Sequence, residues 1–250
     1  MSPAELAHFA VVIPAYNEAA TLRDVANRAL LQLSRVIVVD DGSTDGSAQV
    51  LEGLPVTLLS HAQNLGKAAS LWDGMQHALE AGAEAVITLD GDGQHEPEDI
   101  ARLIEAFQQH PQAIIIGARL HDWQKIPIAR YCANRFANFW IAWAAGCPIA
   151  DSQSGFRVYP AELLRALNIA HGKSAGFVFE SEILIEAGRR GVASVAVPVR
   201  AIYSSHARPS HFHEVVDIAR ITRMVAWKLL ARGLFLPGLW RSLRRGSPGR

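Results

Sequence analysis

The side chains best suited to chemistry in this chain come directly after an apolar run in its first half. The run 86–89 has the composition of a buried strand, and Asp90, Asp92 and Gln94 follow it with single glycines between them. Alternate residues of an extended segment point to the same side, so these three side chains can converge on one ligand. Converging oxygens suit a hard divalent cation such as Mg²⁺ or Mn²⁺, with a diphosphate completing the shell. The spacing therefore predicts a nucleotide-binding site.

A second pair of acids stands in the same setting earlier in the chain. The β-branched run 35–39 delivers Asp40 and Asp41 into a turn rich in Gly, Ser and Thr. Acids at the carboxyl ends of strands lie where ligands bind in open α/β sheets. For either cluster alone, a role restricted to turns and helix caps stays open.

The elements that must position these acids alternate in type through the first half of the chain. We expect strands at 9–13, 36–39, 56–60, 86–89 and 113–116, and helices at 18–33, 46–53, 66–81 and 97–109. This alternation predicts an α/β fold with a mostly parallel, Rossmann-like sheet flanked by helices.

Beyond Gly117 the alternation gives way to longer helical segments. Helices are expected at 130–145, 178–190 and 214–232, and Pro198 favours an edge position for a strand at 194–203. We expect one catalytic domain over 1–212 and, over 213–250, an amphipathic basic helix with a disordered tail.

Composition excludes several classes of protein. Lys plus Arg (24) balances Asp plus Glu (24), so no global field favours nucleic acid as a partner. Cys132 and Cys147 lack a metal-ligand spacing, and we expect them to be reduced in a cytoplasmic setting. The longest stretch without charge, 136–150, is shorter than the roughly 20 residues that span a bilayer. We expect no transmembrane helix and no signal peptide.

Five motifs follow one another in an order that resembles a known family. They are Val11-Val12-Ile13-Pro14-Ala15-Tyr16-Asn17-Glu18, Val39-Asp40-Asp41-Gly42-Ser43-Thr44-Asp45, Asn64-Leu65-Gly66-Lys67, Leu89-Asp90-Gly91-Asp92-Gly93-Gln94-His95 and Asp151-Ser152-Gln153-Ser154-Gly155-Phe156-Arg157. The chain resembles glycosyltransferase family 2, and within it the branch of dolichol-phosphate and undecaprenol-phosphate sugar synthases. The resemblance implies a GT-A fold and a metal-dependent, inverting transfer of a hexose from a UDP- or GDP-sugar.

The resemblance also implies roles for individual residues. The nucleotide sugar would be bound by Pro14, Tyr16, Glu18, Val39, Asp41, Lys67, Asp90, Gly91, Asp92, Arg119 and Arg208. Asp92 and Gln94 would hold the Mg²⁺ or Mn²⁺ ion. These roles agree with the chemistry, because a leaving nucleoside diphosphate gains negative charge that a cation and a guanidinium stabilise. Plain alternatives stay open for Tyr16 as a half-buried aromatic and for Lys67 as a solvated lysine.

Asp151 and Glu180 are the candidate catalytic carboxylates. A hydroxyl acceptor requires a general base, whereas an acceptor phosphate is already an anion and requires none. Polyprenyl phosphate is the expected acceptor; a hydroxyl of another lipid or of a secondary metabolite is the alternative. The loop 203–213 departs from the dolichol-type pattern, with Arg208 or His211 as its cationic contact, which leaves donor and acceptor identity open.

Two segments bear on contact with a membrane. The expected helix 130–145 is rich in Trp and Phe, and the basic segment from 214 onward leads into an apolar stretch at 234–240. Such residues suit a peripheral position on the cytoplasmic side of a membrane. Alternatively, the apolar stripe of the last helix packs on the domain.

Other classes fit less well. The run from Asp41 to Glu52 nearly matches a calcium-binding EF-hand loop, but a strand rather than a helix precedes it. A nucleotidyltransferase would carry a glycine-rich basic loop where Pro14 to Glu18 stands. The three histidines His206, His211 and His213 lack the spacing of a zinc site. A catalytically silent scaffold is the alternative from a different class, and Asp90, Asp92 and Gln94 argue against it.

Overall fold

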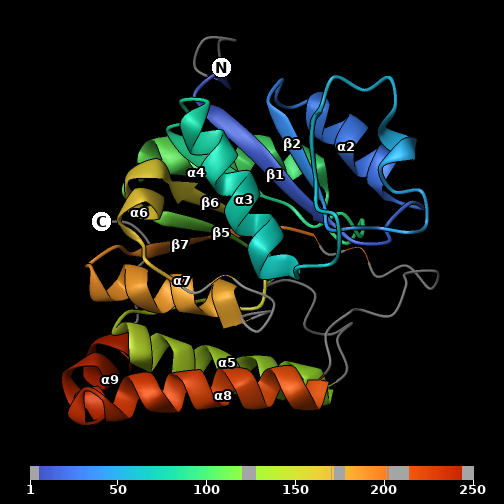
Figure 1. Cartoon of the computed structure of the whole chain (residues 1–250). Helices are drawn as coiled ribbons and strands as arrows, with labels where there is room; N and C mark the ends of the chain where they lie inside the picture. Colours follow the sequence, from blue (N-terminus) through green and yellow to red (C-terminus); the bar gives the residue numbers. More distant parts are fainter. Residues whose placement is uncertain are drawn as a thin grey trace.

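The structure is a computed structural model, which describes residues 6–119, 128–169, 171, 178–200, 202 and 214–243. Its described residues form one seven-stranded sheet (Figure 1). The strands are β1 (Phe9–Ala15), β2 (Val36–Asp40), β3 (Thr57–Ser60), β4 (Ala85–Thr88), β5 (Ile114–Ala118), β6 (Arg157–Pro160) and β7 (Ser194–Pro198). They lie in the order β3-β2-β1-β4-β6-β5-β7, which places β7 at an edge as Pro198 predicted.

The sheet is mostly parallel, which confirms the predicted α/β class. β6 alone among these strands runs antiparallel to both of its neighbours, β4 and β5. The amino end of β6 therefore lies at the same end of the sheet as the carboxyl ends of β1, β2, β4 and β5. Residues that precede β6 share this end with residues that follow the parallel strands.

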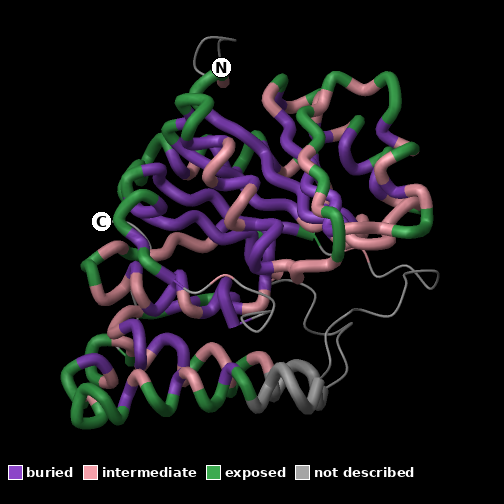
Figure 2. Tube along the Cα trace, in the orientation of Figure 1, coloured by how far each residue is buried: buried purple, intermediate pink, exposed green. Residues whose placement is uncertain are grey.

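Helices cover both faces of the sheet. They are α2 (Leu22–Leu30), α3 (Lys67–Glu80), α4 (Ile100–Gln109), α5 (Ile128–Ala145), α6 (Ala161–Ala166), α7 (Val178–Arg189), α8 (Glu214–Leu230) and α9 (Leu236–Leu243). Alternation along β1 sends Val12 into a core cluster with α3, α5, α7 and α8, and Val11 and Ile13 into another with α2 and α4. Strands β1, β2, β4, β5 and β6 are buried throughout (Figure 2), whereas β3 and β7, at the two ends of the strand order, are partly or largely exposed.

An outer layer of helices lies beyond α7. Figure 1 shows α5 and α8 side by side, with α7 between them and the sheet. Ile221, Val225 and Leu229 of α8 are buried in the same cluster as α5 and α7. The stripe predicted for the last helix thus packs on the protein over these residues, while the domain boundary at 212/213 stays a prediction. The tail beyond 243 lies outside the described residues.

Several predicted element bounds were wrong. The helix expected from 18 begins at Leu22, because Asn17 adopts a φ of 57° and the next residues form a turn. In place of the helix at 46–53 there is one short 3-10 turn, Gln49–Leu51, between Gly46 (φ 90°) and Gly53 (φ 82°). Helices α6 and α9 were not expected. No described helix is both long and apolar enough to cross a bilayer.

Candidate functional site

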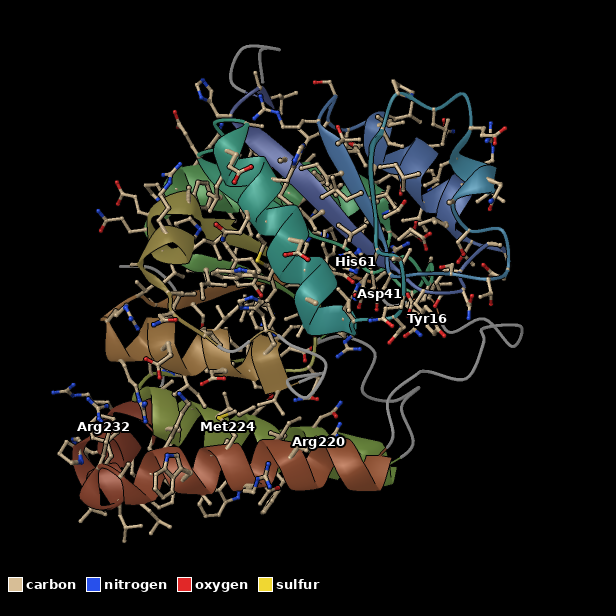
Figure 3. The ribbon with its side chains drawn as sticks, viewed as in Figure 1. Tyr16, Asp41, His61, Arg220, Met224 and Arg232 are labelled. Carbon is tan, nitrogen blue, oxygen red and sulfur yellow. The ribbon has the colours of Figure 1, made fainter. Side chains whose placement is uncertain are left out.

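The loops after β1 and β2 are joined to each other by side-chain hydrogen bonds. The backbone N–H groups of Asn17 and Glu18 donate to the hydroxyls of Ser43 (2.9 Å) and Ser47 (2.8 Å). Asp41 donates its own N–H to the carbonyl of Ala15 (2.8 Å). This joining places Tyr16 beside the Asp41 turn, where Figure 3 also shows His61.

The carboxylate of Asp41 organises the loop that leads into α3. It is buried, and it accepts the N–H groups of Leu65 and Gly66 at 2.8 Å each. Its Oδ1 also lies 2.7 Å from Nδ1 of His61, whose Nε2 lies 3.1 Å from Oδ2 of Asp73. His61 was missed by sequence reasoning, and its position at the end of a strand was the available signal.

The predicted metal motif lies where β4 ends. The hydroxyl of Thr21 donates to the carbonyl of Gly91 (2.7 Å), and Asp92 accepts the N–H of Gln94 (3.0 Å). Burial and the neighbouring carboxylate of Asp90 raise the pKa of Asp92 to about 6. A charged Asp92 is therefore unfavourable here, and a bound cation would offset that cost.

The donor set fits a cation that shares its shell with a ligand. Among the described residues, no group of three His, Cys, Asp or Glu side chains could hold a metal ion by itself. Mg²⁺ commonly takes few protein ligands and completes its shell with phosphate and water. Asp92 and Gln94 meet that requirement, whereas His206, His211 and His213 lie outside the described residues.

Lys67 brings two distant acids together. It is the first residue of α3, and its Nζ lies 2.8 Å from Asp90 and 3.1 Å from Glu180. Burial alone would lower the pKa of Lys67, but the two carboxylates raise it above its usual range. The same ammonium lowers the pKa of Asp90 against the opposing effect of burial. Lys67 is therefore an internal counter-ion and not a solvated lysine.

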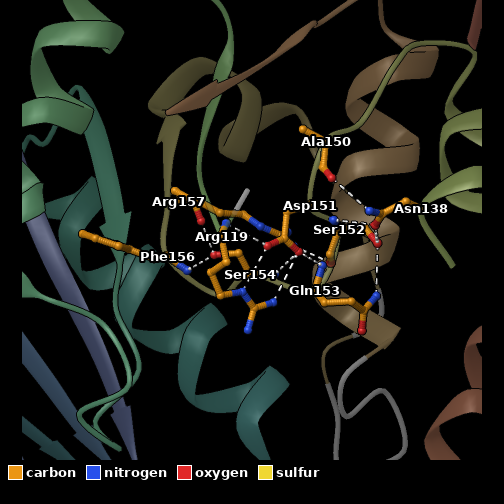
Figure 4. A network of polar contacts seen from close by, with 10 residues as sticks. Arg119, Asn138, Ala150, Asp151, Ser152, Gln153, Ser154, Phe156 and Arg157 are labelled. Atoms are coloured by element: carbon orange, nitrogen blue, oxygen red, sulfur yellow. Dashed lines mark hydrogen bonds and ion pairs between the residues drawn. The ribbon is translucent and has the colours of Figure 1, made fainter. Parts of the chain in front are cut away.

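Asp151 is the centre of a polar network (Figure 4). Its carboxylate pairs with Nε of Arg119 at 3.1 Å and accepts the N–H groups of Gln153 (3.0 Å) and Ser154 (3.1 Å). Burial alone would raise the pKa of Asp151, but Arg119 and the backbone donors lower it. A carboxylate stabilised as an anion in this way is a weak proton acceptor.

Arg157 connects the Asp151 turn to α7. Its fully buried guanidinium donates to the carbonyls of Ser152 (2.8 Å) and Glu180 (2.9 Å) and to the hydroxyl of Tyr159 (3.2 Å). These bonds set the start of α7, and with it the carboxylate of Glu180, against Lys67. The sequence motif 151–157 contains Arg157 but does not indicate that this side chain connects the turn to α7.

Gly155 allows the turn before β6 to approach Asp90. A Cβ atom on Gly155 would lie 2.6 Å from Oδ2 of Asp90 and 3.1 Å from its Cγ. The carbonyl of Gly155 also accepts the hydroxyl of Thr88 at 2.6 Å. Next to it, burial lowers the pKa of His95 to about 4, which keeps that imidazole neutral beside Phe156.

We expect Gly155→Ala to lower kcat by about tenfold or more, because the new methyl group must displace the Asp90 carboxylate from Lys67. Steady-state kinetics with the thermal unfolding midpoint would measure this. Gly191→Ala provides the control, since nothing lies within 4 Å of its Cβ position, although its φ of 80° makes that change strained. Equal kcat for Gly155→Ala and the wild type would contradict the close approach.

The structure places the remaining predicted residues in different ways. Pro14 and Val39 are buried within β1 and β2. Gly91 is buried in the predicted metal motif, and Glu18 lies in the loop between β1 and α2. Arg208 lies outside the described residues.

Comparison with known proteins identifies a family and its relatives. A family model described as Glycosyl transferase family 2 matches residues 10–164. The UDP-N-acetylglucosamine--dolichyl-phosphate N-acetylglucosaminyltransferase of Methanococcus voltae is 27% identical over 248 residues, covering 90% of this chain and 94% of the relative. The undecaprenyl-phosphate mannosyltransferase of Micrococcus luteus is 27% identical over 244 residues, covering 93% and 96%.

A solved structure shows the same fold. It is glucosyl-3-phosphoglycerate synthase from Mycobacterium tuberculosis in complex with Mn²⁺, UDP and glucosyl-3-phosphoglycerate. The match has a TM-score of 0.62 at 23% identity and covers 93% of this chain and 84% of that chain. With a family model that spans well over half of its length, this chain belongs to glycosyl transferase family 2.

Proposed function

We propose that the chain transfers a sugar from a nucleotide-diphosphate donor to a polyprenyl phosphate, with inversion at the anomeric carbon. An oxygen of the acceptor phosphate attacks that carbon from the face opposite the diphosphate. The new carbon–oxygen bond forms as the bond to the donor breaks, and the electron pair leaves with the nucleoside diphosphate. The relatives named above act on dolichyl and undecaprenyl phosphates, which supports this acceptor class.

One observation carries the choice of acceptor. Both candidate bases are engaged as anions, Asp151 by Arg119 and two backbone N–H groups, and Glu180 by Lys67. A hydroxyl acceptor would need one of them to take a proton in the transition state. A phosphate oxygen needs no such help, and the arrangement of charges therefore favours a phosphate.

The chain's own residues would position and stabilise the leaving group. Asp92 and Gln94 would hold Mg²⁺ or Mn²⁺, which supplies positive charge to the diphosphate when it is bound. Arg119 is oriented by Asp151 and would add a guanidinium to the same charge. Asp41 would act by fixing the loop 61–66 at the nucleoside end of the site.

The test compares two acceptors that share one polyprenyl chain and differ in the group at its end, a phosphate in one and a hydroxyl in the other. We expect transfer from a UDP- or GDP-sugar to undecaprenyl phosphate, at least about 100-fold faster than to undecaprenol, and loss of transfer with EDTA that Mn²⁺ or Mg²⁺ restores. Product formation by radiolabelled sugar in detergent would measure both. Faster transfer to the alcohol would contradict the proposal and favour Asp151 or Glu180 as a base.

The proposed acceptor also determines where the enzyme works. A polyprenyl chain keeps its phosphate at the surface of a bilayer, so the protein would act in peripheral contact with the cytoplasmic face of a membrane. The absence of a spanning helix among the described residues is compatible with such contact.

A further inference from the structure

The side of α8 and α9 that faces away from the protein is unusually apolar. Large side chains there are exposed, led by Trp227 (71%), Leu230 (64%) and Trp240 (64%). Trp227 and Leu230 follow Arg223 at intervals of four and three residues, so the three share one side of α8. We call this surface the outer α8–α9 face and define it by Arg223, Trp227, Leu230, Leu234, Leu236 and Trp240. Figure 2 shows exposed residues along both α8 and α9.

After its first turn, the same segment carries only positive charge. Asp217 is the last acid of the chain, and eight Lys or Arg residues follow it. Arg220, Arg223, Arg232 and Arg241 are exposed along α8, at its end and in α9, and Figure 3 shows Arg220 and Arg232 far apart on the same layer. Apolar side chains beside arginines suit a surface that is apolar inside and anionic outside.

Helix α8 packs on the protein through the side opposite the outer face. The opposite side of α8 is buried through Ile221, Val225 and Leu229. Lys228 turns inward, with its Nζ 2.8 Å from Glu182 and 2.7 Å from Glu186. The corner between the two helices is held by Trp143, whose indole N–H donates to the carbonyl of Leu234 at 3.0 Å. These contacts hold α8 and the start of α9 on the protein while the outer α8–α9 face stays exposed.

We propose that the outer α8–α9 face docks on an anionic lipid bilayer. Exposed Trp and Leu side chains would enter the boundary between head groups and acyl chains, while the arginines would meet lipid phosphates. Docking there brings the site towards its acceptor, because α7 carries Glu180 and packs directly on α5 and α8. The inference gives the membrane contact of the proposed function a location, and its test does not depend on transfer activity.

The experiment measures binding of the full chain to vesicles. Flotation would compare phosphatidylcholine vesicles with vesicles that contain one third phosphatidylglycerol, for the wild type and for Trp227→Ser with Trp240→Ser. We expect the wild type to prefer the anionic vesicles, with binding weakened by salt, and the double variant to bind about tenfold more weakly. Leu31→Ser is the matched control, since Leu31 is 75% exposed at the end of α2 and lies outside the face.

Two further readouts separate this inference from the proposed function. A water-soluble, short-chain polyprenyl phosphate removes the need for a membrane, and with it the double variant should turn over as fast as the wild type. Equal vesicle binding by wild type and double variant would overturn the docking face, whatever the activity. A wild-type dimer in sedimentation that the double substitution dissociates would also overturn it, because the face would then join two copies of the chain.

Discussion

Replacing Lys67 by Met is expected to cost both activity and stability. The change leaves the carboxylates of Asp90 and Glu180 buried without the ammonium that now lies between them. Breaking a buried ion pair in this way destabilises a protein by about 3 kcal/mol. It also releases Asp90 from its position beside Gly155, and we expect kcat to fall by about 100-fold or more. Urea unfolding and steady-state kinetics measure the two effects.

A second substitution separates these two effects. In Lys67→Met with Glu180→Gln one of the two uncompensated charges is gone, so stability should recover in part while kcat stays low. Glu180→Gln alone tests the role of that carboxylate: as a counter-ion its loss should cost about tenfold or less, and as a general base about 1000-fold. If Glu180→Gln lowered kcat by about 1000-fold without loss of stability, Glu180 would be a general base and not merely a partner in the ion pair with Lys67.

Asp92→Asn is expected to abolish transfer without weakening the fold. The amide keeps the shape of the side chain but removes the charge that would hold the divalent ion, so we expect kcat/KM to fall by at least about 1000-fold. Stability should change in the opposite direction. With its pKa raised to about 6, a charged Asp92 is unfavourable in the metal-free protein at neutral pH, and this cost shrinks as the pH falls from about 6 towards the ordinary pKa of 3.8. We therefore expect the metal-free variant to be more stable than the wild type by about 2 kcal/mol at pH 7.5.

The measurements are radiolabelled transfer, isothermal titration with Mn²⁺ and nucleoside diphosphate, and thermal unfolding with EDTA. Asp24→Asn is the control, because the side chain of Asp24 is 68% exposed and pairs only at the surface with Arg28. Transfer by Asp92→Asn at a rate close to the wild type would show that the cation site lies elsewhere or that no cation is needed.

Local patterns predicted most of the fold. Strands such as β2 and β4 are continuous apolar runs that end in acids, and the helices between them show the period of a buried face. Errors arose where side chains bond to distant backbone. A helix was expected from Gly46 and would have contained Ser47, but the oxygens of Asp45 and Ser47 accept the N–H groups of Ala19 and Glu18, and the chain forms a turn there instead. Hydrogen bonds between residues so far apart in the sequence cannot be predicted from the residue pattern of either segment alone.

The candidate site was predictable in its residue types and not in its contacts. The sequence indicated that Asp90 and Asp92 end a strand, because that depends on neighbours along the chain. It could not indicate that Lys67 meets Glu180, since their meeting depends on how α3 and α7 pack. The motif made Asp151 a candidate base, whereas its ion pair with Arg119 depends on the pairing of β5 with β6.

Because β6 is antiparallel to β5, the segment between them begins and ends at the same end of the sheet. That segment leaves the sheet at Arg119 and returns at Asp151, and the ion pair between these two residues joins its ends. It contains α5, and both of its ends lie at the same end of the sheet, where the parallel strands finish. Chain length inside such a closed excursion can change at little entropic cost and without a shift in strand register. We therefore expect relatives of this chain to differ in length between β5 and β6 while the pairing of β4, β5 and β6 is kept.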